Sequence, residues 1–346
     1  SMVDLIWFPT GGGKTEAYLG LTAMTIFYRR FRHPEESNGT TVIMRYTLRL
    51  LAAQQFTRAS TLICACERIR KDCEAKKSRY KRYVLGKSPI TIGLWIGGDH
   101  TPNTNEKAKK NLEHLNKSAG YSLEYAKDTY NKFQVLKCPW CGTRMTPEQD
   151  KTKKIRGIFG YRMRSSNHFE LFCPRQSCPF GNGLPVQVVD QELYTKPPTL
   201  LFGTVDKFAM LPWNEQIGNF FALNSANRAP ELIIQDEQTE AQDIKQYTDI
   251  MEYLRKLNER GVTVVMITHD MHLMLEYTPR ALVFSDGQLI ADRRASEVLC
   301  DPKLIKRAAL KETSLFTLAN HCAITPPEAF VERFIGEDRE VRSHGC

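Results

Sequence analysis

A glycine-rich segment near the start of the chain has the residue types of a phosphate-binding loop. Thr10-Gly-Gly-Gly-Lys-Thr15 follows an apolar stretch, Val3 to Phe8, and opens a predicted helix. The three glycines allow backbone N–H groups to turn toward a phosphate where a Cβ atom would intrude. Lys14 would reach the β- and γ-phosphates of a nucleotide, and the hydroxyl of Thr15 would bind Mg²⁺. The predicted phosphate-binding residues are Thr10, Gly11, Gly12, Gly13, Lys14 and Thr15.

An acidic pair at the end of another apolar stretch has the residue types of the second half of a nucleotide site. Leu232-Ile-Ile-Gln-Asp-Glu237 is typical of a buried strand that ends in two carboxylates. Asp236 would hold Mg²⁺ through water together with Thr15, and Glu237 would orient and polarise the attacking water. Together the two segments predict a site for Mg·ATP and outweigh the alternative of an ordinary glycine turn.

Four cysteines in two closely spaced pairs predict a metal site. Cys138-Pro-Trp-Cys141 has the spacing of a metal-binding knuckle, and Cys173-Pro-Arg-Gln-Ser-Cys178 is a looser second pair. Four thiolates form a closed tetrahedral site, which favours structural Zn²⁺, and free thiols are the alternative. The apolar periodicity around these pairs is weak, so a bound metal would supply the missing core. Cys64, Cys66 and Cys73 lie on a predicted helix, where buried thiols are favoured over an iron–sulfur cluster.

Alternating strand and helix patterns must position these residues. The predicted strands are Val3–Phe8, Thr40–Tyr46, Ile90–Gly97, Thr199–Gly203, Glu231–Gln235 and Val262–Thr268. The predicted helices are Lys14–Phe31, Thr47–Lys77 and Asp243–Arg260. Asp286-Gly287 predicts a hairpin, Asp301-Pro302 a helix start, and the tail from Ser296 is helical in pattern. We therefore expect an α/β fold, a three-layer P-loop NTPase with a mainly parallel sheet, a small zinc-binding insertion and a helical C-terminal tail.

The sheet pattern is interrupted, which predicts four segments. Residues 1–98 form the first part of the NTPase domain, and the polar, lysine-rich residues 99–198 form a zinc-binding insertion. The domain resumes at 199–237 and is followed by a C-terminal part at 238–346.

Composition and charge limit the partners. Hydrophobic content of 42% and charged content of 25% are typical of a globular protein, and no apolar run is long enough to span a membrane. The ten cysteines show no disulfide-framework spacing, so we expect a reducing, cytoplasmic location without direct membrane insertion. The net charge of +9 is uneven: residues 1–237 carry +12, and residues 238–346 carry −3.

A basic first part is compatible with nucleic acid, and a solvated basic surface is the alternative. Two stretches are rich in cations, Arg68–Lys87 and Lys151–Arg164. The second also contains Phe159 and Tyr161, which could stack on the bases of a single strand.

From the glycine-rich segment to Glu237 the sequence resembles superfamily 2 helicases, especially the large helicase-domain proteins of bacterial antiphage defence. Thr10–Thr15 resembles their first motif, and Asp236-Glu237 fits their acidic motif. Met44-Arg-Tyr-Thr-Leu-Arg-Leu-Leu-Ala-Ala-Gln54 and Gly203-Thr-Val-Asp-Lys-Phe208 are similar to motifs that contact nucleic acid. The resemblance implies an ATPase that binds nucleic acid, DNA in preference to RNA.

After Glu237 the sequence resembles the ATP-binding subunits of ABC transporters, above all those of energy-coupling-factor importers. The similar segments are Gln238-Thr-Glu-Ala-Gln-Asp243, Gly261-Val-Thr-Val-Val-Met-Ile-Thr-His-Asp270 and Ala281–Gly287. This resemblance implies that His269 senses the γ-phosphate and acts in catalysis with Glu237. A histidine at the rim of a strand without that role is the alternative.

Both resemblances are partial, which favours a chimeric chain joined at the acidic strand that the two families share. Ala222–Asn227 stands where an ABC protein has its Leu-Ser-Gly-Gly-Gln signature, and no second motor domain follows the helicase-like part. We therefore expect ATP binding with ATP hydrolysis, whereas strand separation is left open. The alternatives are an ATP-binding subunit with membrane-transporter partners, and a nucleotide-binding hybrid with little turnover.

Overall fold

The computed structural model divides the chain into two compact units, which are described separately. One unit contains residues 1–18 and 232–346, and the other contains residues 19–231. The structure describes residues 3–7, 14–46, 49–76, 80, 82–149, 154–165, 167–208, 214–223, 225, 227–236, 244–267, 271–285, 287–310 and 313–344. No helix among these residues is both long enough and apolar enough to cross a membrane.

The unit of residues 19–231 is built on four parallel strands in the order β2-β9-β3-β8. The strands are β2 (Val42–Tyr46), β9 (Leu200–Thr204), β3 (Ile92–Trp95) and β8 (Val186–Gln187). Every residue of the first three strands is buried, as expected for parallel strands covered on both faces. The helices α1 (Lys14–Arg32), which begins before this unit, and α2 (Arg49–Glu74) match the predicted helices to within a few residues, and α2 packs against β2, β9 and β3.

Aromatic side chains fill the core beside these strands. The Trp95 ring meets the rings of Phe208 and Phe220 edge-on, with centroids 5.2 and 5.3 Å away. The predicted motif Gly203–Phe208 begins at the end of β9 and continues into the short helix α6 (Val205–Phe208). A Cβ atom on Gly203 would lie 2.6 Å from the Phe208 ring, so a larger residue there would require the ring or the strand to shift.

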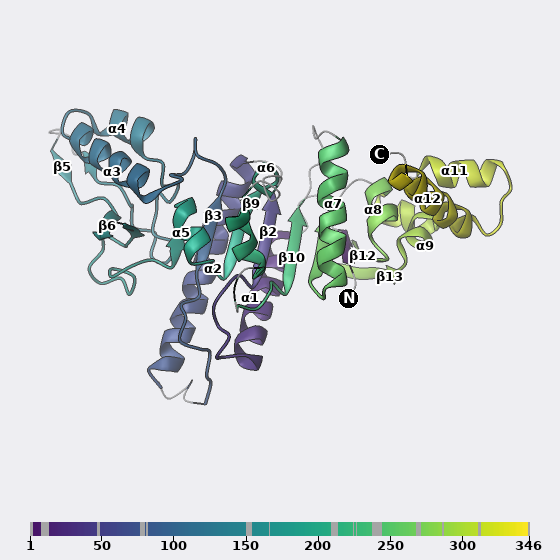
Figure 1. Ribbon diagram of the computed structural model, residues 1–346, viewed down its shortest axis with the longest axis horizontal. Helices are drawn as coiled ribbons and strands as arrows, with labels where there is room; N and C mark the ends of the chain where they lie inside the picture. The colour runs from purple at the N-terminus through teal and green to yellow at the C-terminus, as the bar shows by residue number, and fades with distance from the viewer. Residues whose placement is uncertain are drawn as a thin grey trace. The chain divides into compact units, whose positions relative to one another are not determined.

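The predicted insertion is more helical than its sequence suggested. Its elements are α3 (Asn105–Ala119), α4 (Leu123–Tyr130), β4 (Glu148–Gln149), β5 (Ile155–Arg156), β6 (Tyr161–Ser165), β7 (His168–Leu171) and α5 (Asp190–Thr195). Figure 1 shows α3, α4, β5 and β6 gathered at one side of β3 and β9. The two helices were not predicted, although Thr104 and Ser122 cap their first turns with side-chain hydrogen bonds.

Two consecutive arginines at the end of α1 bind the loops that lead into the strands. Arg29 donates hydrogen bonds to the backbone oxygens of Asn38, Thr40, Arg228 and Ala229, and pairs with Glu231 at 2.9 Å. Arg30 donates to the backbone oxygens of Leu85, Ser88 and Pro89, just before β3. Burial lowers the pKa of both guanidinium groups, that of Arg30 to about 10.

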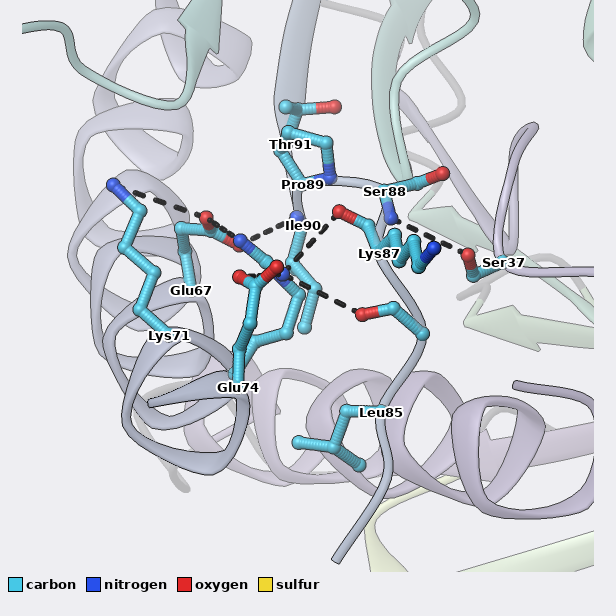
Figure 2. A network of polar contacts seen from close by, with 12 residues as sticks. Ser37, Glu67, Lys71, Glu74, Leu85, Lys87, Ser88, Pro89, Ile90 and Thr91 are labelled. Carbon is cyan, nitrogen blue, oxygen red and sulfur yellow. Dashed lines mark hydrogen bonds and ion pairs between the residues drawn. The ribbon is translucent and has the colours of Figure 1, made fainter. Parts of the chain in front are cut away.

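A buried ion pair on α2 binds the loop before β3, the loop that Arg30 also contacts (Figure 2). Arg70 donates two hydrogen bonds of 2.8 Å to the Glu67 carboxylate, and these bonds raise the pKa of Arg70. Glu67 also accepts the N–H of Ile90 at 2.7 Å, and Arg70 bonds Glu74 and the backbone oxygens of Gly86 and Lys87. The start of β3 is therefore held by buried charge as well as by the sheet.

The unit of residues 1–18 and 232–346 contains the strand order β13-β12-β1-β11-β10, in which only β13 is antiparallel. The strands are β1 (Val3–Trp7), β10 (Leu232–Asp236), β11 (Thr263–Ile267), β12 (Arg280–Ser285) and β13 (Gln288–Arg293). β12 and β13 form the predicted hairpin. The helices are α7 (Ile244–Glu259), α8 (Met271–Tyr277), α9 (Ala295–Leu299), α10 (Pro302–Ala308), α11 (Ser314–His321) and α12 (Pro327–His344).

The predicted fold class is confirmed in its main features. Both units have parallel strands with connecting helices, and a helical tail ends the described chain. Asp301 accepts hydrogen bonds from the N–H groups of Lys303 and Leu304, so α10 begins at Pro302 as predicted.

Candidate functional site

The four predicted cysteine ligands lie together in the insertion. The sulfur atoms of Cys138, Cys141, Cys173 and Cys178 all lie within 4.8 Å of one another, and those of Cys141 and Cys173 are 3.5 Å apart. Tetrahedral Zn–S bonds of about 2.3 Å would separate the sulfurs by about 3.8 Å. The cluster therefore has the size and the donor set that Zn²⁺ requires.

Tight turns present each pair of thiols to the same point. The N–H of Gly142 donates to the oxygen of Cys138, and Gly142 has a φ of 71°, which glycine adopts without strain. In the second turn the N–H of Cys178 donates to Arg175 and that of Cys173 to Phe180. Burial raises the pKa of Cys138 to about 11, whereas in Cys141 the effect of burial is outweighed by hydrogen bonds with Thr143, which lower the pKa to about 6.

The second cysteine turn lies beside helix α2. The Lys71 ammonium lies 5.6 Å from the centre of the Phe180 ring, and Trp140 meets that ring edge-on at 5.6 Å. Cys64, on the same helix, is buried, and burial followed by the charges of Cys138 and Cys178 raises its pKa. The sequence predicted that Cys64 is a buried or incidental thiol but gave no sign that it lies near the cluster.

The predicted nucleotide residues follow three parallel strands of one sheet. β11 pairs with β1 on one side and β10 on the other, and Met266 lies opposite both Leu5 and Gln235. β1, which precedes the glycine-rich segment in the sequence, and β10, which ends at Asp236, therefore end at the same carboxyl edge of the sheet. Lys14 and Thr15 begin helix α1, where Thr15 is buried with its hydroxyl 3.2 Å from that of Tyr18.

Several predicted residues lie outside the described part of the chain. These are Thr10, Gly11, Gly12, Gly13, Glu237 and His269. Asp236 is described only as the last backbone position of β10. Their roles remain predictions.

In the second predicted cationic stretch, one of the two aromatic residues is not available for stacking. Tyr161 is buried and donates its hydroxyl hydrogen to the Val135 oxygen at 2.7 Å, so its ring is closed to a base. Arg162 and Arg164 both pair with Glu170 at 2.7 Å. In the first stretch Arg70 is buried in its pair with Glu67. Residue type did not indicate that these particular side chains are buried or paired, because their partners lie elsewhere in the sequence.

An ion pair that sequence reasoning missed joins the insertion to the Gly203–Phe208 motif. The Lys207 ammonium lies 2.7 Å from the Asp190 carboxylate at the start of α5. Burial raises the pKa of Asp190, although Lys207 acts to lower it. No local pattern marks this pair, since its members stand on different elements.

The two parts of the chain resemble two different kinds of protein. The DISARM protein DrmA of Bacillus paralicheniformis is 38% identical over 231 residues, which are 64% of this chain and 18% of that protein. A protein of Enterococcus faecalis described as an ABC transporter ATP-binding protein is 58% identical over 113 residues, 33% of this chain and 20% of its own length. One from Clostridium perfringens is 53% identical over 114 residues, 33% of this chain and 20% of its own length. Both predicted resemblances, to a helicase-like defence protein and to ABC ATP-binding proteins, are confirmed.

The chain spans about a fifth of the length of these curated relatives. No protein-family model matches it. Among solved structures, cbiO1 of Clostridium perfringens, part of the ABC transporter complex cbiONQ, is 23% identical over 30% of this chain and 40% of its own, with a TM-score of 0.22. A nucleotide-free ATP-binding cassette from an ABC transporter is 14% identical over 88% of this chain and 87% of its own, with a TM-score of 0.31. TM-scores this low do not establish a common fold.

Proposed function

We propose that this chain is a P-loop NTPase that binds and hydrolyses Mg·ATP. The observation that carries the proposal is the strand order β1-β11-β10, with one strand between the strand before the glycine-rich segment and the strand that ends at Asp236. Because the three strands are parallel, their carboxyl ends lie at one edge of the sheet, and nucleotides bind at that edge in open α/β sheets. The resemblance to ATP-binding proteins supports ATP as the nucleotide.

In this proposal each residue has one role. Lys14 binds the β- and γ-phosphates, and Thr15 and Asp236 hold Mg²⁺. Glu237 orients the attacking water, and His269, which follows β11, contacts the γ-phosphate. The glycine-rich segment supplies backbone N–H groups to the phosphates, helped by the dipole of α1.

We also propose that the four cysteines bind one structural Zn²⁺ ion. The close packing of four sulfurs supports this assignment, and no open ligand position is needed. The ion would stabilise an insertion at residues 99–198 within an NTPase domain made of residues 1–98 and 199–237, with residues 238–346 as an ABC-like part.

The ATPase is proposed to respond to nucleic acid, DNA in preference to RNA. The basic charge of residues 1–237 and the similarity to a DISARM protein support a nucleic-acid partner. An ATP-binding subunit of an ABC transporter is the second candidate, supported by the 58% identity over 113 residues.

The test is ATP binding and hydrolysis by the purified chain, with and without single- and double-stranded DNA. We expect Lys14→Ala to abolish ATP binding, and Lys256→Ala, an exposed lysine on α7 of the same unit, to leave it unchanged. ATP affinity that is unchanged in Lys14→Ala would overturn the assignment. Stimulation by DNA supports the first candidate, and turnover indifferent to DNA favours the second.

A further inference from the structure

The segment that bears the cysteine cluster has a large excess of basic over acidic residues. Residues 131–184 contain ten lysines and arginines but only three acidic residues, a net charge of +7, against +9 for the whole chain. A Zn²⁺ ion with four thiolates would contribute a formal charge of −2, so the segment stays strongly basic with the metal bound. Such a field attracts polyanions.

Only some of these cations face solvent without an acidic partner. Arg162 and Arg164 share Glu170, and Arg144 pairs with the exposed Glu148 at 2.7 Å. Within the part of the chain that the structure describes, Arg175 forms no ion pair, and neither does Lys127 at the adjoining end of α4. The positive charge that a ligand could neutralise therefore belongs to particular side chains, among them Arg175 and Lys127.

Lys127 and Arg175 each line one of two open hollows that meet. The first has a volume of about 530 Å³ and is lined by Lys127, Lys137 and Arg144, with Asp128 as its acidic residue. The second has a volume of about 520 Å³ and is lined by Arg144, Arg156 and Arg175, with Glu148 as its acidic residue. Arg144 and Thr146 belong to both hollows, so the two form one continuous surface.

Each hollow also contains an exposed apolar side chain. Leu136 in the first is 62% exposed, and Ile158 in the second is 56% exposed. Cations beside exposed aliphatic groups suit a single strand, because it offers phosphates to the cations and unstacked base faces against which apolar surface can be buried. A duplex would offer the phosphates but keep the faces of its bases stacked and out of reach.

We propose that these two hollows, joined at Arg144, form a binding surface for single-stranded nucleic acid on the cysteine-bearing insertion. Lys127, Lys137 and Arg175 contact phosphates, and Leu136 and Ile158 contact bases. This inference rests on the proposed nucleic-acid-responsive ATPase and names the surface through which a strand is held. Binding here requires neither ATP nor the glycine-rich segment.

The test is the affinity of the full chain for a fluorescent single-stranded oligonucleotide, measured without nucleotide over a series of salt concentrations. Lys127→Glu and Arg175→Glu each reverse one charge in a different hollow. We expect the double variant to lose affinity about tenfold or more, and the slope of log affinity against log salt to fall by about 0.7 for each lost phosphate contact. Lys117→Glu, an exposed lysine of α3 outside both hollows, is the matched control for each single variant and keeps the wild-type slope.

Zinc content and thermal unfolding of each variant show whether the insertion is intact. If zinc content and thermal unfolding are unchanged, then equal affinity and equal salt slope in the double variant and in Lys117→Glu would overturn the proposal. Duplex bound as tightly as the single strand would also overturn it, as would a preference for an acidic peptide. Lys14→Ala keeps oligonucleotide binding if the surface acts as proposed, so a failed ATPase assignment and a failed surface give different results.

Discussion

The sheet and the insertion of residues 19–231 are stabilised in different ways. The sheet region buries charge: Arg29, Arg30 and the Glu67–Arg70 pair bind the loops that lead into its strands. In the insertion, four sulfurs lie within 4.8 Å of one another. A large sheet can surround buried ions with backbone partners, whereas a small segment with a limited core gains more from a metal.

The largest expected effect comes from removing one thiolate. In Cys138→Ser we expect loss of bound zinc and unfolding of the insertion, because structural zinc contributes roughly 10–16 kcal/mol of apparent binding free energy to such sites. Metal analysis and hydrogen exchange check this: amides of β6 and β7 should lose protection, while those of β2 and β9 keep it. Cys322→Ser, at an exposed cysteine outside the cluster, is the control. Wild-type protein without stoichiometric zinc would contradict the prediction.

The next effect concerns the buried ion pair. In Glu67→Ala the Arg70 guanidinium would remain buried without its main partner, and the N–H of Ile90 would lose its acceptor. We expect the free energy of unfolding to fall by about 3–5 kcal/mol. Glu113→Ala, which removes an exposed carboxylate 4.0 Å from Lys109, should change it by less than about 1 kcal/mol. Urea unfolding measures this free energy for both variants. Equal losses of free energy would mean that the buried pair contributes no more to stability than the exposed one.

A smaller effect is expected from the uncharged packing contact between Gly203 and the Phe208 ring. In Gly203→Ala the new methyl group would overlap the Phe208 ring and disturb the end of β9. We expect a loss of about 1–3 kcal/mol. Gly336→Ala on α12 meets no heavy atom within 4 Å and should be neutral or stabilising by up to about 1 kcal/mol. Thermal unfolding distinguishes the two, and a neutral Gly203→Ala would show that the ring moves aside freely.

The sequence was sufficient for features that depend on local pattern. Apolar runs bounded by turns predicted the parallel strands, and the spacing of Cys138 and Cys141 predicted the cluster. The helix α3 was missed although Ala108, Leu112 and Leu115 recur at helical spacing, because the lysines between them made the segment look irregular.

Long-range polar contacts were not predictable in the same way. Arg29 falls within the predicted helix Lys14–Phe31, but nothing near it in the sequence indicates that its carboxylate partner is Glu231, far along the chain. The same holds for Lys207 and Asp190, whose pairing depends on how the insertion packs. Residue type indicates that a buried charge needs a partner, and only the fold indicates which one.

The smallest effect concerns the Asp190–Lys207 pair, which joins the insertion to the sheet region. Because burial raises the pKa of Asp190, the folded chain binds this proton more tightly than the unfolded chain does. The contribution of this group to stability is therefore fully present below the unfolded pKa of about 4 and is lost as pH rises through the folded pKa. Asp190→Asn removes this titration. The free energy of unfolding of the variant, relative to that of the wild type, should therefore increase as pH rises from about 4 through the folded pKa of Asp190. Urea unfolding at several pH values checks this against Asp128→Asn on the exposed end of α4, and a difference from wild type that does not change with pH would mean that Lys207 compensates fully for burial.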